Sequence, residues 1–261
     1  MRIALGIEYN GSQFCGWQMQ SSGVRTVQQV LENALSKVAD EKINIVCAGR
    51  TDTGVHATGQ VVHFDTQAVR DEKAWVMGVN THLPDDVSSL WCCIVDDDFS
   101  ARFSATARQY RYVISNRRAR PAILNSLVSW RYGAIDEEAM HRAAQALTGE
   151  HDFSSFRSAA CQADHARRNV HYVNVHRKDD FIFIDIAANA FLHHMVRNIV
   201  GSLLMIGQNE KPEDWIAELI DLEDRTQAGP TAPAGGLYMV KVTYPEKYRI
   251  PAEVFLPVFK A

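Results

Sequence analysis

Hydrophobic periodicity changes in a similar order twice along the chain, and this order constrains the fold more than any other sequence feature. Residues 2–9 place alternate apolar side chains on one face, as a half-buried strand does. A capping-box pattern at Thr26 and Gln29 then opens a helical stripe from Val27 to Val38. The spacing predicts more elements in this half: strands near 43–48, 60–66 and 87–95 and a helix near 71–80.

The second half follows this order loosely. A strand spans Arg108 to Ile114, and a helix begins behind Asp136 and stops at Gly149. The remaining periodicity predicts strands at 169–177, 181–188 and 237–244, a helix at 191–206 and a short helix from Pro212. These elements predict an α+β fold of two subdomains, residues 1–105 and 106–261, although no sequence-level repeat supports a duplication.

Composition excludes several classes of protein. The chain has 261 residues, of which 46% are hydrophobic and 22% charged, which is typical of a folded globular protein. Its apolar runs are far shorter than the ~20 residues of a membrane helix, and its first residues show no cleavage site of a signal peptide. Five cysteines without a C-x-x-C pair fit neither a disulfide framework nor a zinc ribbon. A cytoplasmic protein with reduced cysteines is therefore expected.

Basic residues are concentrated although the net charge is −4. No acidic residue occurs between Phe99 and Ile135, a segment with seven arginines, at 102, 108, 111, 117, 118, 120 and 131. A second cluster contains Arg157, Arg167, Arg168, Arg177 and Lys178. Because the arginine guanidinium suits planar contacts to phosphate, the clusters indicate a polyanion partner, with a solvated basic face as the alternative.

A glycine-rich segment between two predicted strands, GRTDTGVHATG at 49–59, is the densest polar signal. Its glycines permit positive φ and close backbone approach. In an extended chain Arg50 and Asp52 would point the same way, and the cation would favour an ionised carboxylate suited to a nucleophile or general base. An Asx turn at Asp52 is the structural alternative. The segment is neither a dinucleotide-binding fingerprint nor a P-loop.

Two further candidates lie in the second half. Tyr110 shares a strand face with Arg108, while Arg111 lies on the other face, so the ring could stack on a base among phosphate-binding cations or simply cover the core. On the predicted helix 191–206, Arg197 lies off the apolar stripe near Gly201, whose missing side chain would leave Arg197 room to reach a carboxylate or phosphate. The adjacent His193 and His194 would diverge by ~100° on a helix, so no metal site is predicted.

These segments resemble the tRNA pseudouridine synthase A family. The similarity includes GRTDTGVHA and covers essentially the whole chain through motifs in the family's order: Tyr9-x-Gly11-x-x-Phe14-x-Gly16-Trp17-Gln18, Thr26-Val27-Gln28, Asn80-x-x-Leu83-Pro84-x-Asp86, Ala101-Arg102-Phe103, Arg108-x-Tyr110-Arg111-Tyr112, His151-Asp152-Phe153-Ser154-Ser155-Phe156, Met195-Val196-Arg197-Asn198 and Ala232-Pro233-Ala234-x-Gly236-Leu237-Tyr238. So many ordered matches are highly specific. No catalytic position departs from the family pattern.

The resemblance implies an enzyme that isomerises uridine to pseudouridine in the tRNA anticodon stem-loop, at tRNA positions 38 to 40. It implies two ferredoxin- or RRM-like subdomains joined into one long, mainly antiparallel sheet, with helices on one side and a central catalytic cleft. A homodimer without metal or organic cofactor is expected. Asp52 is then the catalytic aspartate, Arg50 and Arg197 its cationic supports, and Tyr110 the ring under the target base. The expected substrate-binding residues are Tyr110, Arg108, Arg111, His56, Leu237, Arg117, Arg118, Arg167 and Arg168.

Two other readings of the residues remain open. One is a non-catalytic RNA-binding protein, against which the intact set of Asp52, Arg50, Tyr110 and Arg197 argues. The other is a nucleosidase or glycosidase, which would normally need two acidic groups ~5–9 Å apart, whereas the glycine-rich segment has one. Whether Asp52 attacks C1′, adds to C6 or acts as a base at the sugar is also open.

Overall fold

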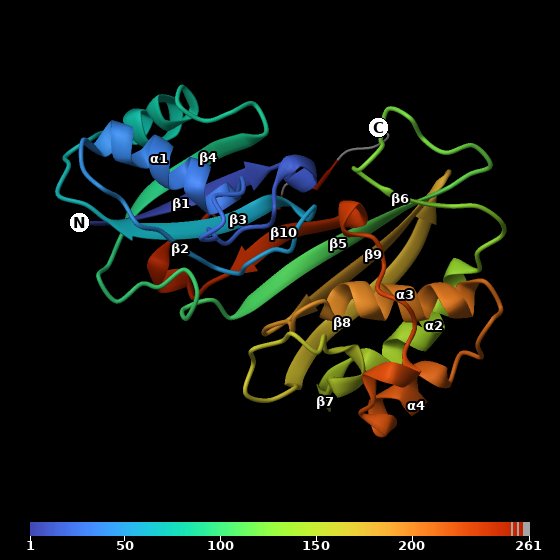
Figure 1. The fold of residues 1–261 in the computed structure, drawn as a ribbon. Coiled ribbons are helices and arrows are strands. Elements are labelled where there is room, and N and C mark those ends of the chain that lie inside the picture. The colour runs from blue at the N-terminus through green and yellow to red at the C-terminus, as the bar shows by residue number, and fades with distance from the viewer. Residues whose placement is uncertain (252, 255, 258–261) are drawn as a thin grey trace. The chain divides into compact units, whose positions relative to one another are not determined.

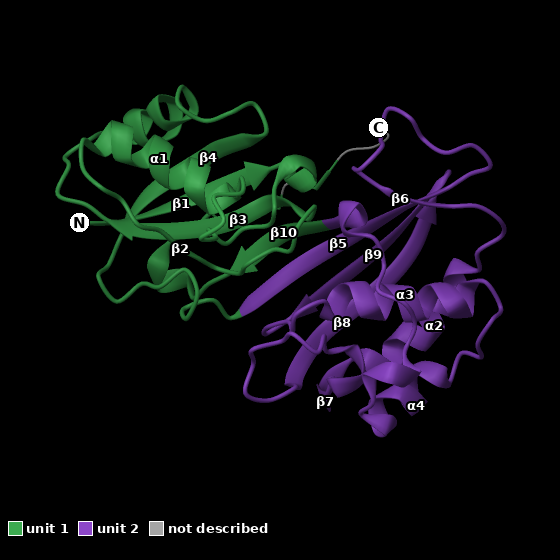
Figure 2. Cartoon of the chain, viewed as in Figure 1, with its two compact units in different colours: residues 1–106, 238–261 green, residues 107–237 purple. Residues whose placement is uncertain are grey.

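The computed structural model describes residues 1–251, 253, 254, 256 and 257, and it divides into two compact units (Figure 2). Unit 1 contains Met1–Thr106 and the C-terminal segment from Tyr238, and unit 2 contains Ala107–Leu237. The predicted subdomains 1–105 and 106–261 differ from this division in the C-terminal segment. The physical reason is strand pairing, because β10 (Leu237–Thr243) runs parallel to β3 (His56–Asp65) through Tyr238 and Met239.

The sheet of unit 1 has the strand order β4-β1-β3-β10, and β2 (Val46–Cys47) also pairs with β3. The central strand β1 (Arg2–Tyr9) is antiparallel to both β3 and β4 (Val87–Val95). Gly6 of β1 lies under the Trp91 indole, whose ring would be only 2.1 Å from a Cβ at this position. The predicted strands 2–9 and 87–95 are confirmed, whereas the strand near 43–48 is shorter and the one near 60–66 begins earlier.

Helices cover one face of this sheet. Helix α1 (Val27–Ala39) begins where predicted, since the Thr26 hydroxyl accepts a hydrogen bond from the Gln29 N–H (3.4 Å). It packs against the π-helical turn η2 (Ala74–Gly78). Trp75 of η2 contacts Phe64 of β3 edge-on. The ribbon shows α1 lying over the strands of this sheet (Figure 1). The other face is covered by aromatic rings around Phe99, which contacts His63, Tyr244 and Tyr248.

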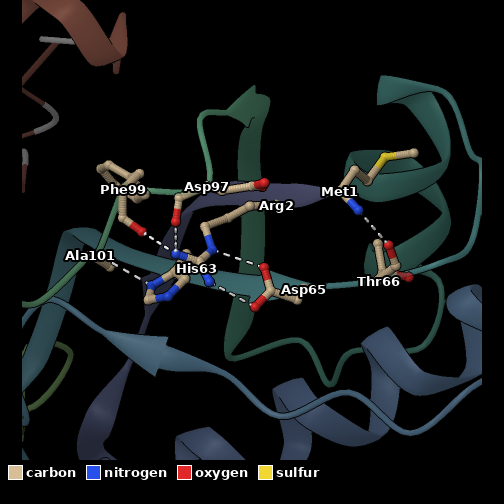
Figure 3. Close-up of polar contacts among 8 residues, drawn as sticks. All are labelled: Met1, Arg2, His63, Asp65, Thr66, Asp97, Phe99 and Ala101. Carbon is tan, nitrogen blue, oxygen red and sulfur yellow. Dashed lines mark hydrogen bonds and ion pairs between the residues drawn. The ribbon is translucent and has the colours of Figure 1, made fainter.

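Polar side chains fix the end of the β1–β3 pair (Figure 3). Arg2 forms two hydrogen bonds with the Asp65 carboxylate, both 2.8 Å, and also donates to the Phe99 carbonyl (2.8 Å). The Ala101 N–H donates to His63 Nδ1 (3.0 Å). Burial lowers the pKa of the His63 imidazole. The positive charge of Arg2 lowers this pKa further, and the negative charge of Asp65 partly opposes the shift. The turn that follows β4 is therefore tied to β1 and β3.

We expect His63→Asn to weaken the pH dependence of stability at acid pH. The unfolded chain binds a proton at His63 below about pH 6.5, but the folded protein resists protonation because its pKa is lowered. The free energy of unfolding thus decreases as the pH falls below this value, by up to about 1.4 kcal/mol per pH unit from this group. Asparagine retains an acceptor for the Ala101 N–H but does not titrate.

Urea unfolding of the wild type, His63→Asn and His82→Asn between pH 7 and pH 5 measures this difference. His82 is exposed and serves as the control. An unchanged pH slope in His63→Asn would contradict the assignment.

The sheet of unit 2 has the order β5-β9-β8-β7, and β6 (Ser129–Arg131) pairs in parallel with β5. The other pairs, among β5 (Ala107–Asn116), β9 (Phe181–Ala188), β8 (Arg167–Lys178) and β7 (Gly149–Asp152), are antiparallel. Helix α2 (Glu137–Ala144) packs on β8 and against α3 (Met195–Gly207) and α4 (Trp215–Leu222) (Figure 1). The predicted α+β class with mainly antiparallel pairing is confirmed.

One predicted helix begins later than expected. Helix α3 starts at Met195 rather than 191, because His194 has left-handed backbone (φ 62°) and precedes the helix as its N-cap. The Asp136 cap of α2 is confirmed, as its carboxylate accepts from the Ala139 N–H (2.8 Å). Among the described residues no helix has the length and apolar character needed to cross a membrane.

Candidate active site

The connection between β2 and β3 in unit 1 carries Asp52. Its carbonyl accepts a hydrogen bond from the Val55 N–H (3.1 Å), and Gly54 has φ +78°, as the third position of a type II turn requires. The Asp52 side chain is half-buried and Arg50 is exposed. Residues 50–52 belong to no strand, and the common direction of Arg50 and Asp52 stays a prediction. A main-chain turn thus presents the carboxylate.

The last residue of β1 and the segment that follows it support this turn through Thr51. The Tyr9 and Thr51 hydroxyls form a buried hydrogen bond (2.8 Å), and the Trp17 N–H donates to the Thr51 carbonyl (3.0 Å). Gly16 has φ +83°, and a Cβ there would be 3.0 Å from the Thr51 carbonyl oxygen. Tyr9, Gly16 and Trp17 belong to a motif shared with the family, but no role was predicted for them. The structure shows that they hold the backbone next to Asp52.

His56 lies at the start of β3, at the end of the same connection. It is 1% exposed, its Nδ1 accepts from the Gly11 N–H (3.0 Å), and its ring stacks on Tyr238 at 4.6 Å. Gly11 packs so closely that a Cβ would be 2.0 Å from the Val55 carbonyl oxygen. His56 was predicted to bind substrate. We interpret it as a positioning residue that holds Gly11 against Val55, the last residue of the Asp52 turn.

Tyr110 lies on β5 in unit 2, opposite Ile186 of β9. Its ring is 8% exposed and meets Phe191 edge-on at 5.0 Å. On the same strand, Arg108 Nη1 donates to the Asn189 carbonyl (2.9 Å). These contacts orient both side chains at the end of β5 and β9.

Arg111 is engaged on the opposite face of β5. Its Nε and Nη2 donate to the two carboxylate oxygens of Asp185, both at 2.7 Å, and its guanidinium lies 5.0 Å from the Phe183 ring. Only 13% and 10% of the two side chains are exposed. Arg111 was predicted to bind substrate, but we interpret it as half of an intramolecular ion pair. Sequence spacing could not reveal Asp185 as its partner.

Arg197 belongs to the first turn of α3 and is tied to the segment that precedes β10. Its Nε donates to the Ala232 carbonyl (2.8 Å), and the Ala232 N–H donates to the Arg197 carbonyl (3.0 Å). The prediction that Gly201 leaves open space for the Arg197 side chain was wrong. The Pro230 carbonyl oxygen occupies this space, 1.7 Å from the position of a Cβ. Gly201 thus lets a backbone segment approach α3.

Two further residues of the family motifs, Asn198 and Tyr112, hold the segment that precedes β10. No role was predicted for either residue. Asn198 is fully buried; its Nδ2 donates to the Phe156 carbonyl (2.8 Å), and its Oδ1 accepts from the Thr231 hydroxyl (2.6 Å). The Tyr112 hydroxyl donates to the Pro233 carbonyl (2.8 Å), and burial raises the pKa of Tyr112 to about 12. Leu237, predicted to bind substrate, is 5% exposed and follows the turn η6 (Ala234–Gly236).

The basic clusters divide into structural and surface arginines. Arg177 pairs with Glu137 (2.9 Å), and Arg157 donates to the Ala163 carbonyl (2.6 Å). Arg168 is half-buried, and burial lowers its pKa; Cys161 opposes this shift, and the positive charge of Arg157 adds to it. In contrast, the surface group consists of the exposed Arg117, Arg118, Arg120 and Arg167.

The prediction that His193 and His194 lie on a helix was wrong. His193 and His194 precede α3 rather than lying on it, and their ring centroids are 4.0 Å apart. Divergence on a helix therefore does not separate them. The expectation that the enzyme uses no metal stays a prediction.

The sequence of this chain is similar to known proteins over most of its length. Residues 6–104 and 143–245 match the protein-family model described as tRNA pseudouridine synthase. Curated proteins named tRNA pseudouridine synthase A are 60% identical in Shewanella woodyi and 61% in Shewanella amazonensis, each over 99% of both chains. The protein of that name in Hydrogenovibrio crunogenus is 58% identical over 97% of this chain and 96% of its own.

Among solved structures, one described as "Crystal Structure of a Cbf5-Nop10-Gar1 Complex" matches with a TM-score of 0.40 and 10% identity, covering 91% of this chain and 48% of that chain. This similarity is too low to carry an argument. The sequence matches to the curated proteins are much stronger than this structural match. They extend over nearly the full length of the chain and include both units. The chain belongs to the tRNA pseudouridine synthase A family.

Proposed function

We propose that this protein isomerises uridine to pseudouridine in tRNA. The observation that carries the proposal is the Asp52 turn, whose backbone is held by the Thr51 contacts of Tyr9 and Trp17. Family membership supports the assignment of the reaction. A main-chain turn held in this way can present a carboxylate in one orientation, as a catalytic nucleophile or base requires.

The reaction rearranges one nucleotide without a net redox change. The C1′–N1 bond of uridine breaks, a C1′–C5 bond forms, the C5 proton leaves to water and N1 gains a proton. The target uridine must first leave its stack, which costs a few kcal/mol. Asp52 acts as nucleophile or base, Arg50 and Arg197 stabilise its ionised form, and Tyr110 stacks on the base. This chemistry requires no organic cofactor or metal.

We further propose the finer features of the family for this chain. The substrate uridines are those of the anticodon stem-loop at tRNA positions 38 to 40, and the enzyme acts as a homodimer in the cytoplasm. All five cysteines are unpaired thiols, which fits a reducing compartment. Surface arginines of unit 2 bind phosphates and position the RNA without reading its sequence.

Incubation of the protein with tRNA labelled with tritium at uracil C5 tests the proposed reaction. Release of tritium to water with the base retained in the RNA identifies isomerisation. Free uracil would instead identify a hydrolase, and absence of release a protein that only binds RNA. Sequencing of the modified positions then tests the anticodon stem-loop assignment.

We expect the Arg117→Ala, Arg118→Ala double variant to bind tRNA more weakly and with a flatter salt dependence. Both side chains are exposed and near each other in sequence, so each can neutralise a phosphate. Loss of two such contacts lowers the slope of log Kd against log salt concentration by about 1.4 to 1.8. Titration of tRNA at several salt concentrations measures this slope. Arg142→Ala, which breaks the exposed pair with Glu213, is the control. An unchanged slope would remove both residues from the interface.

A further inference from the structure

The turn after β4 presents an aromatic ring to solvent beside an arginine. Phe103 is 79% exposed, and the Arg102 guanidinium lies 5.0 Å from the centroid of its ring. Both residues belong to the Ala101-Arg102-Phe103 motif, to which the proposed reaction assigns no role. They also lie in the segment between Phe99 and Ile135 that has no acidic residue.

Single exposed apolar side chains are common and need no function. Phe103 differs because the backbone before it is fixed from several sides. The Ala101 N–H donates to His63 Nδ1 (3.0 Å) and its carbonyl accepts from the Tyr244 hydroxyl (2.7 Å). Arg2 donates to the Phe99 carbonyl, and Figure 3 shows these anchors from β1 and β3 meeting the turn.

The turn is also closed on itself. The Ser104 N–H donates to the Ser100 carbonyl (2.9 Å), and the Ser100 N–H donates to the Ser104 hydroxyl (2.9 Å). The Phe103 N–H donates to the Ser100 hydroxyl (3.3 Å). The backbone is thus ordered before any ligand arrives, so that little conformational entropy is lost when the ring binds one.

Arg102 also links this turn to the candidate active site within unit 1. Burial raises the pKa of the Cys47 thiol to about 12, and the positive charges of both Arg50 and Arg102 oppose this shift. The positive charges of the two arginines therefore act on the same residue of β2.

We propose that Phe103 and Arg102 form a stacking platform for an unpaired base of the RNA substrate, with Arg102 also binding a backbone phosphate. The proposal rests on the proposed tRNA substrate. An aromatic face with an adjacent guanidinium is a typical arrangement for holding a base outside a helix. The platform is a binding element and takes no part in bond making.

Binding of an unmodified tRNA transcript to Phe103 variants tests the platform, and an Asp52→Asn background prevents turnover. Phe103→Ala is expected to raise the Kd about 5- to 100-fold. Phe103→Tyr, which keeps a ring, should bind like the parent, whereas Phe103→Leu should not. Ile94→Ala removes another strongly exposed apolar side chain of unit 1 and is the control.

Salt dependence separates the two parts of the platform. Phe103→Ala should weaken binding equally at all salt concentrations, whereas Arg102→Ala should lower the slope of log Kd against log salt by about 0.7 to 0.9. With active Asp52, Phe103→Ala should raise KM and leave kcat at saturating tRNA unchanged.

Wild-type affinity of Phe103→Ala, or full recovery in Phe103→Leu, would overturn the stacking role. A changed sedimentation coefficient with unchanged RNA affinity would also overturn it and assign the ring to contact with a second copy of the chain. A wild-type protein that binds tRNA but releases no tritium would refute the proposed reaction alone, because the binding experiments test the platform independently.

Discussion

Asp52→Asn is expected to abolish pseudouridine formation and to leave tRNA affinity nearly unchanged. Asparagine has almost the same shape as aspartate but lacks the negative charge that a nucleophile or base needs. The turn itself is closed by main-chain groups and held through Thr51, so the substitution leaves its anchors in place. Loss of a group that transfers protons alone costs about 10²–10⁴ in rate, and loss of a covalent nucleophile costs more.

The measurement combines tritium release from C5-labelled tRNA with a titration of tRNA binding. Thr53→Ala, an exposed position in the same turn, is the matched control and should retain activity. Full turnover by Asp52→Asn would refute the assignment of Asp52. Loss of tRNA binding together with activity would show that the carboxylate holds the RNA rather than acting on it.

Gly201→Ala is expected to destabilise the protein, although alanine favours helices. The new Cβ would lie 1.7 Å from the Pro230 carbonyl oxygen, a backbone atom that cannot move without shifting the segment held by Arg197. Overpacking of this kind costs about 1–3 kcal/mol. The intrinsic preference of a helix for alanine over glycine, about 1 kcal/mol, offsets only part of that cost.

Gly78→Ala is the matched control for this prediction. Its Cβ would meet Val38 at 3.8 Å and Ala74 at 4.0 Å, which are ordinary contacts. It should leave the free energy of unfolding unchanged or raise it by up to about 1 kcal/mol. Urea unfolding of both variants measures the difference. Equal stability of Gly201→Ala and wild type would restore the earlier idea that open space lies beside Arg197.

Elements whose signals are local in sequence could be predicted well. The caps at Thr26 and Asp136 are confirmed because a cap is a hydrogen bond across three residues. The start of α3 was placed too early, because apolar periodicity continues through Leu192 and does not show that His194 has a positive φ. A local backbone reversal of this kind has no hydrophobic signature.

The candidate site was only partly predictable. Its glycine-rich composition identified the Asp52 turn, but the contacts that hold it come from Tyr9 and Trp17, about forty residues earlier in the chain. Arg111 was also only partly predictable, since the sequence shows a basic side chain on an alternating strand but not its partner Asp185. Only the register of β5 with β9 reveals that partner.

The α+β class, the helix caps and the Asp52 turn followed from local patterns, because periodicity, capping and glycine-rich turns act over a few neighbouring residues. The pairing of β10 with β3, the hydrogen bond from the Gly11 N–H to His56 and the Pro230 carbonyl beside Gly201 became visible only in the folded chain. These features depend on contacts between distant residues. Strand register and close backbone approach select such contacts, and neither leaves a local pattern in the chain.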